Sequence, residues 1–226
     1  MDTGYLTILP QDIDPSVIGP VLCAGLTTYK AVRNSGIKPL EWIVVVGAGG
    51  GLGHLAVQYA TACGARVIGI DGGAGKRDLV LNQLGATEYL DFTSMSSEDL
   101  ISTVRKITNG GAHAAVVTAG SAAAFARAAD MLRIGGTLSC VGIPPDKESF
   151  IRTNIGTIVI RGLTIKGNLV GNLKECLDAV EFVRQGKVKP IVKIRPFREL
   201  EEIYKDMQEA KIEGRVVVKI GDDFEV

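Results

Sequence analysis

The residues best suited to chemistry in this sequence are glycines that follow the apolar run Trp42–Val46 and precede an Ala/Leu/Val-rich helical pattern. Gly47, Gly50 and Gly53 recur at every third position, and Asp71 ends the next apolar run. A strand, a glycine turn and a helix let backbone N–H groups and the helix dipole receive a phosphate, and the later carboxylate accepts from a ribose hydroxyl. The pattern predicts a dinucleotide site, although the strict GxGxxG spacing is not met.

An alternation of short apolar runs and helical patterns must position these residues. Strands are expected at 42–47, 66–71, 88–91, 114–118, 136–141 and 162–167. Helices are expected at about 51–63, 75–84, 97–108 and 121–132. Val/Ile-rich strands that are apolar on both faces are typical of a parallel sheet covered by helices on both sides. We therefore predict the α/β class, with a doubly wound parallel (Rossmann) sheet of six strands.

The two ends of the chain are predicted to lie outside this sheet. A short strand is expected at Tyr5–Leu9, and three prolines interrupt the chain before a helix at about 21–33. After residue 150 the expected order is extended structure at 158–160, a helix at about 172–185, a strand at 191–194, a helix at 197–210 and a closing strand from 214 to 220. The expected division of the chain is 1–22, 23–170 and 171–226.

Composition limits the classes of partner. Lys+Arg and Asp+Glu are balanced at 25 each, which argues against nucleic acid or an anionic membrane. No apolar run approaches the ~20 residues of a membrane span, and the first residues do not form a secretory signal. The cysteines are far apart and form no CxxC pair, which favours a reduced, cytoplasmic setting. They are Cys23, Cys63, Cys140 and Cys176.

Several stretches together resemble the zinc-dependent medium-chain alcohol dehydrogenases of the yeast and fungal type. The stretches are VLCAGLTTYK at 21–30, GAGGGLGHLAVQYA at 47–60, GIDGG at 69–73, GNLVGN at 167–172 and KIEGRVVV at 211–218. They cover nearly the whole chain in order. The resemblance implies NAD(H) as the cofactor and a small molecule as the substrate.

The resemblance also implies roles for individual residues. Asp71 would hold the adenosine ribose and select NAD over NADP, with Lys76 at the ribose edge. Arg215 would reach the cofactor phosphates, Thr27 would lie near the nicotinamide, and Cys23 matches a ligand of the catalytic zinc. The expected cofactor-binding residues are Gly47, Gly50, Gly51, Leu52, Gly53, Asp71, Lys76, Val141, Gly142, Leu169 and Arg215.

One departure from the resembled family is large. Its members carry an N-terminal catalytic domain that supplies further zinc ligands, whereas residues 1–20 contain neither Cys nor His. Because a catalytic zinc needs about three protein ligands, we expect no metal site in this chain. Residues 1–22 and 171–226 are then expected to be remnants of the catalytic domain, flanking an NAD-binding Rossmann domain at 23–170.

Other polar residues have competing interpretations. Tyr29 beside Lys30 could form an acid–base couple with Thr27 nearby, although adjacent helical residues point about 100° apart, so at most one faces the site. Thr27 and Tyr29 are the catalytic candidates. Cys23 is either an orphaned ligand or a small core residue. His54, at a helix start, either donates to a phosphate or caps the helix at the surface.

The function that these expectations favour is an NAD(H)-binding oxidoreductase, a truncated alcohol dehydrogenase that acts without catalytic zinc on a small molecule, for instance in specialised metabolism. Two alternatives stay open: a redox-neutral isomerase, dehydratase or cyclase on the same scaffold, and a non-catalytic cofactor-binding subunit completed by a partner chain. Apolar surface at 158–167 also predicts a homodimer formed through the sixth strand, as in the resembled family.

Overall fold

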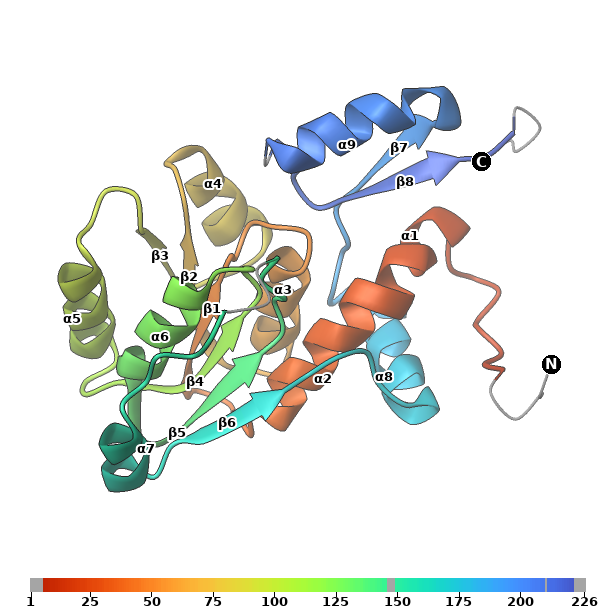
Figure 1. The fold of residues 1–226 in the computed structure, drawn as a ribbon. Coiled ribbons are helices and arrows are strands. Elements are labelled where there is room, and N and C mark those ends of the chain that lie inside the picture. The colour runs from red at the N-terminus through yellow and green to blue at the C-terminus, as the bar shows by residue number, and fades with distance from the viewer. Residues whose placement is uncertain (1–5, 146–148, 210, 222–226) are drawn as a thin grey trace.

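A six-stranded parallel sheet forms the centre of the molecule (Figure 1). The computed structural model describes residues 6–145, 149–209 and 211–221. The strand order is β3-β2-β1-β4-β5-β6, which confirms the doubly wound prediction and makes the order reverse between β1 and β4. The strands are β1 (Trp42–Val46), β2 (Arg66–Asp71), β3 (Glu88–Asp91), β4 (Ala112–Val117), β5 (Leu132–Cys140) and β6 (Thr164–Gly167).

Helices cover both faces of this sheet. One face carries α2 (Leu26–Asn34) and α3 (Gly53–Ala62), and the other carries α5 (Ser97–Ile107) and α6 (Ala122–Met131). The helix predicted at 75–84 is divided into α4 (Gly75–Asp78) and the π-helical turn η3 (Leu79–Gln83).

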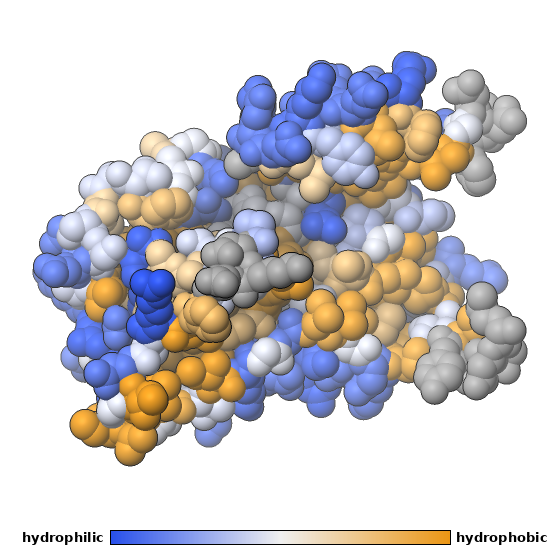
Figure 2. Space-filling model, in the orientation of Figure 1, coloured by the Kyte–Doolittle hydropathy of each residue, from blue (hydrophilic) through white to orange (hydrophobic). Residues whose placement is uncertain are grey.

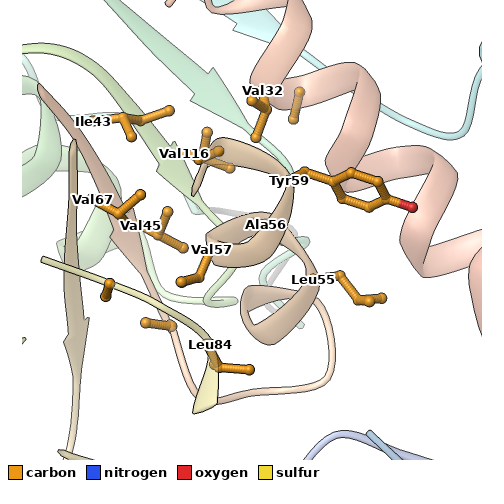
Figure 3. Packing of buried hydrophobic residues seen from close by; sticks show 14 of the residues in the cluster. Val32, Ile43, Val45, Leu55, Ala56, Val57, Tyr59, Val67, Leu84 and Val116 are labelled. Carbon is orange, nitrogen blue, oxygen red and sulfur yellow. The ribbon is translucent and has the colours of Figure 1, made fainter. Parts of the chain in front are cut away.

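Strand β1 shows why the sequence folds this way. Its residues alternate between the two cores: Ile43 and Val45 pack with α2 and α3, whereas Val44 and Val46 pack with α5 and α6. Because both faces of a doubly wound sheet are covered, such a strand is apolar at every position rather than at every second one. Figure 3 shows the first of these cores, in which Val57 of α3 lies close to Val45.

The N-terminal segment differs from the sequence-based expectation in two ways. No strand forms at residues 6–9, and Tyr5 lies outside the described residues. Helical structure begins at Pro15 rather than at residue 21, through α1 (Pro15–Pro20) and the π-turn η2 (Val21–Gly25) into α2. Asp14 caps α1 by accepting from the Ser16 N–H at 2.7 Å. Proline fits the first helical position, where no N–H donor is needed, and the widened turn follows directly after Pro20.

The extended structure predicted at 158–160 is wrong. These residues belong to α7 (Ile155–Arg161), a short helix beside β5. The β-branched run favours a strand by propensity, but both ends of the segment carry helix caps. The Asn154 side chain accepts from the N–H groups of Gly156 and Thr157, and Gly162 ends the helix in the left-handed conformation at φ 56°.

After β6 the chain forms one more helix on the main body and then a separate small layer of 191–219, the C-terminal layer (Figure 1). Helix α8 (Leu173–Arg184) packs on α2, and the chain then runs to a two-stranded parallel sheet of β7 (Val192–Pro196) and β8 (Arg215–Lys219). These strands are joined by the 3-10 turn η4 (Phe197–Glu199) and α9 (Leu200–Gln208). Ala210, the last residue of the helix predicted at 197–210, lies outside the described residues.

No helix in the described part of the chain is both long and apolar enough to cross a membrane.

Candidate dinucleotide-binding site

The predicted glycine turn lies at the carboxyl end of β1, beside the point where the strand order reverses. Ligands of open α/β sheets bind in the crevice outside the carboxyl ends of the strands at such a point. The turn leads directly into α3, so the first N–H groups of that helix face this edge of the sheet. The fold therefore places the glycines where an anionic ligand would be bound.

Glycine suits each of the three regularly spaced positions for a different physical reason. Gly47 adopts φ 84°, which favours glycine. A Cβ on Gly53 would lie 1.8 Å from the Gly47 carbonyl oxygen, so only glycine lets α3 start this close to β1. A Cβ on Gly50 would meet only that same oxygen, at 3.4 Å, and its outer side is open. The turn thus leaves an open space at Gly50 that a side chain there would fill.

Asp71 at the end of β2 is tied to the turn. Its carboxylate is buried, with 7% of the residue exposed, and accepts from the Gly49 N–H at 2.7 Å and from the Gly72 N–H at 2.7 Å. The Lys76 ammonium donates to the same carboxylate at 2.9 Å. The structure therefore brings together the glycine turn, Asp71 and Lys76, three of the features expected from the sequence.

A cavity of about 280 Å³ opens beside Asp71, between β2 and α6. It is mostly apolar, and its wall includes Ile70, Phe92 and Ala124. The Arg127 guanidinium lies 5.8 Å from the centre of the Phe92 ring. A flat, partly apolar ring would fit this space. Sequence reasoning missed Phe92 and Arg127; the available signal was that Phe92 directly follows the third predicted strand.

The far side of the site is built from the ends of β5 and β6. A Cβ on Gly142 would lie 2.3 Å from the Ala119 carbonyl oxygen, so the chain after β5 packs directly on the chain after β4. Val141 is buried beside it, whereas Leu169 is 65% exposed. Asn168 joins α2 because its side-chain oxygen accepts from the Asn34 amide at 2.9 Å.

Arg215 reaches the glycine turn from the C-terminal layer. Its guanidinium lies 3.1 Å from the position that a Cβ of Gly51 would occupy. The first residue of β8 thus sits beside a turn that is 164 residues earlier in the sequence. This places a permanent positive charge next to the backbone N–H groups of the turn.

Comparison with known proteins agrees with this geometry. Residues 51–185 match the sequence profile of the family described as zinc-binding dehydrogenase. The chain belongs to the zinc-binding dehydrogenase family.

Two curated relatives of this chain are fungal proteins. It is 41% identical over 216 residues to an alcohol dehydrogenase of Schizosaccharomyces pombe, covering 96% of this chain and 60% of the relative. It is 39% identical to alcohol dehydrogenase 1 of Emericella nidulans, covering 96% of this chain and 61% of that protein. The chain therefore spans about 60% of the length of these relatives.

Solved structures in the family share the fold. The alcohol dehydrogenase of the archaeon Aeropyrum pernix has a TM-score of 0.83 and 29% sequence identity, covering 94% of this chain and 61% of the other. A benzyl alcohol dehydrogenase from Acinetobacter calcoaceticus has a TM-score of 0.85 and 26% sequence identity, and the match covers 95% of this chain and 59% of the other. These similarities confirm the resemblance found in the sequence.

The two residues expected to be catalytic lie in different surroundings. The Thr27 hydroxyl donates to the Cys23 carbonyl at 2.8 Å and accepts from the Val170 N–H at 3.0 Å, so it fastens the chain after β6 to α2. Tyr29 is buried between helices, with its ring 5.5 Å from that of Tyr59 and 5.7 Å from that of Phe182. Burial raises the pKa of its hydroxyl, which lies 3.4 Å from Asp178. These contacts join Tyr29 to α3 and α8.

Both interpretations of His54 at the sequence level are wrong. Its side chain is fully buried, so it neither caps α3 at the surface nor faces a phosphate. Instead its ring lies between Gly50 and Ile191. Burial, helped by the positive charge of Arg215, lowers the pKa of His54 to about 4.

Zinc is the metal that the family implies, and the described residues do not fit it. Cys23 is exposed, which also overturns its interpretation as a core residue. Among the described residues, no three His, Cys, Asp or Glu side chains lie close enough together to hold a metal ion. A catalytic zinc needs about three protein ligands and one open position.

Proposed function

We propose that this chain is an NAD(H)-binding oxidoreductase of the alcohol dehydrogenase type that acts on a small-molecule substrate. The observation that carries the proposal is the contact between the glycine turn and the buried Asp71 at the reversal point of the sheet. The names of the relatives and of the Aeropyrum structure support the same reaction class.

The residues present fit a nicotinamide dinucleotide. Gly47, Gly50, Gly51, Leu52 and Gly53 would hold the pyrophosphate on the start of α3. Asp71 would accept from the adenosine ribose while its negative charge repels a 2′-phosphate, and the apolar cavity beside Phe92 would receive the adenine. Arg215 would pair with a cofactor phosphate because its guanidinium already lies against the turn.

On the other side, Val141, Gly142 and Leu169 would flank the nicotinamide ring. When bound, this ring supplies hydride transfer, and the chain supplies orientation and a partly dry surrounding. Thr27 would act by holding the segment around Val170 in place, since both of its hydrogen bonds are already made to backbone groups. Catalytic roles for Thr27 and Tyr29 stay predictions.

We propose that the chain works without catalytic zinc, because its described donor set does not supply one. We also propose a cytoplasmic setting, supported by four unpaired cysteines. A second copy of the chain is the partner that we propose, joined through the edge of β6 and the exposed apolar side chains of α7.

Binding of the cofactor is tested by titrating the purified chain with NADH and, separately, NADPH, following fluorescence. We expect saturable binding of NADH and much weaker binding of NADPH. Absence of saturable binding would contradict the proposal. Equal affinities for NADH and NADPH would show that Asp71 does not select between them. NADH binding without turnover of primary or secondary alcohols would favour a cofactor-binding subunit, and stoichiometric zinc in metal analysis would overturn the zinc-free reaction.

A further inference from the structure

We infer that His54 is a positioning residue that links the glycine turn to the C-terminal layer and so holds the Arg215 guanidinium beside Gly51. This inference deepens the proposed function, because it explains how a distant segment of the chain would be held against the cofactor phosphates. It concerns contacts within the protein, and these can be measured with or without the cofactor.

Both nitrogens of the His54 ring are used. Nδ1 lies 3.0 Å from the Gly50 carbonyl oxygen, and Nε2 accepts from the Ile191 N–H at 3.2 Å. A carbonyl only accepts and an N–H only donates, so these partners assign the neutral tautomer with its proton on Nδ1. The same Gly50 oxygen also accepts from the His54 backbone N–H at 3.0 Å. One side chain therefore touches the turn with one end and the C-terminal layer with the other.

The series of contacts that begins at His54 continues from Ile191 to Arg215 and returns to the glycine turn. The Ile191 carbonyl accepts from the Arg215 N–H at 2.8 Å. A Cβ on Gly214, which adopts φ 68°, would lie 2.4 Å from that carbonyl oxygen, so glycine permits the close approach. The Arg215 side chain then extends back to Gly51. The contacts therefore form a closed loop from the glycine turn through His54, Ile191 and Arg215 back to the turn. Within this loop, the hydrogen bond to Nε2 of His54 holds Ile191 in place.

A second side chain of α3 attaches the same segment one helical turn later. The Gln58 amide donates to the Lys189 carbonyl at 3.0 Å and accepts from the Lys189 N–H at 2.7 Å. Gln58 holds the segment in place but does not touch the glycine turn through its side chain. A change at His54 should therefore leave the C-terminal layer attached while it loosens the end that carries Arg215.

Two substitutions separate the two ends of the ring. In His54→Asn the side-chain amide can take the place of Nδ1 and donate to Gly50, but it is too short to reach Ile191. In His54→Gln the longer amide can take the place of Nε2 and accept from the Ile191 N–H. If the contact with Ile191 is the positioning contact, Gln preserves the link and Asn breaks it.

The first test is hydrogen exchange at the Ile191 and Arg215 amides in the full chain, without cofactor. We expect exchange at Ile191 to be about 10-fold faster or more in His54→Asn, since this N–H loses its acceptor, and near wild type in His54→Gln. Matched substitutions of the other histidine, His113→Asn and His113→Gln, should leave both amides unchanged. Equal exchange in the two His54 variants would overturn the inference.

The second test combines these variants with Arg215→Gln and measures the Kd for NADH. In wild type and in His54→Gln, removing the guanidinium should weaken NADH binding about 10-fold or more, as expected for a charge-assisted contact. In the His54→Asn background the same removal should cost less than about 3-fold, because the guanidinium is no longer held in place.

The two tests separate the inference from the proposed function. If wild type binds no NADH, the proposed function fails, and the exchange rates still decide whether His54 links the turn to Ile191. If wild type binds NADH and Arg215→Gln has its full effect in the His54→Asn background, the inference fails while the proposed function stands.

Discussion

At the scale of single residues, Asp71 and Lys76 are the pair that we propose selects NAD over NADP. The carboxylate is buried and bound by two backbone N–H groups, so its position is fixed before any ligand arrives. The Lys76 ammonium is neutralised by it at 2.9 Å. If the ribose binds at Asp71 as proposed, a negative charge would face the 2′-phosphate of NADP, and the ammonium of Lys76 is already paired with Asp71.

Replacing Asp71 by Asn should shift the preference toward NADPH. The amide oxygen can still accept from the Gly49 N–H, but the repulsion is lost and Lys76 becomes available to a 2′-phosphate. We expect the ratio of the Kd values for NADPH and NADH to fall about 10-fold or more, measured by fluorescence titration. In the double variant Asp71→Asn with Lys76→Met, this gain should be lost; a gain that survives would show that Lys76 plays no part.

The buried His54 should make stability depend on pH. Burial lowers its pKa from 6.5 to about 4, so in that range the unfolded chain binds a proton that the folded chain does not. The His54 contribution to the free energy of unfolding is therefore fully present above pH 6.5 and is lost as pH falls toward 4. The loss is at most about 1.4 kcal/mol per pH unit.

Urea unfolding of wild type and His54→Gln measures this contribution. Glutamine does not titrate, so wild type should lose about 2 kcal/mol more than the variant between about pH 7 and pH 5. Parallel stability curves for the two proteins would show that the histidine does not carry the effect.

At the scale of elements, the segment 47–53 from the end of β1 to the start of α3 serves packing and, as proposed, binding of the cofactor. Gly53 serves packing, because a Cβ there would lie 1.8 Å from the Gly47 carbonyl oxygen. Gly50 serves the open side of the turn, where a Cβ would meet protein only at 3.4 Å. Two glycines three positions apart are thus required for different reasons.

Alanine substitutions should separate these reasons. Gly53→Ala should destabilise the fold by about 1–3 kcal/mol or more, because α3 must move away from β1. Gly50→Ala should change stability by less than about 0.5 kcal/mol but weaken NADH binding, because a methyl group would stand where the pyrophosphate approaches. Thermal unfolding and NADH titration of both variants test this contrast, and equal destabilisation by both would contradict it.

At the scale of the whole molecule, apolar side chains remain at the surface around α7. Figure 2 shows orange, hydrophobic surface at the lower left, where Figure 1 places α7. In this helix Ile155, Val159 and Ile160 are 77%, 73% and 83% exposed. The neighbouring β6 is the last strand of the large sheet, and all four of its residues are exposed. An open parallel edge beside apolar side chains is suited to pairing with a second copy.

The proposed homodimer can be tested by mass. Wild type at micromolar concentration should have about twice the chain mass of 23.9 kDa in light scattering or sedimentation. Val159→Asp or Ile160→Asp should give the monomer mass, since a charge would be buried without a partner. The matched control Leu40→Asp, at an apolar residue that is 70% exposed elsewhere, should remain dimeric. A monomeric wild type would exclude this interface.

The sequence alone predicted the six strands, the doubly wound parallel sheet, and the positions of the glycine turn and Asp71 at the ends of the first two strands. Each of these depends on local patterns: apolar runs, helix periods and glycines near a strand end. Local patterns failed where two signals competed. The β-branched run at 158–160 favoured a strand, but the Asn154 cap and the left-handed Gly162 made it helical.

The tertiary structure decided the features that depend on residues far apart in the sequence. A sequence pattern cannot tell that the His54 ring is buried between Gly50 and Ile191, or that Phe92 and Arg127 meet beside Asp71. It also cannot tell that the Tyr29 hydroxyl turns toward Asp178. The physical reason is that local sequence sets backbone conformation within a few residues, whereas burial and side-chain partners are set by which elements pack together.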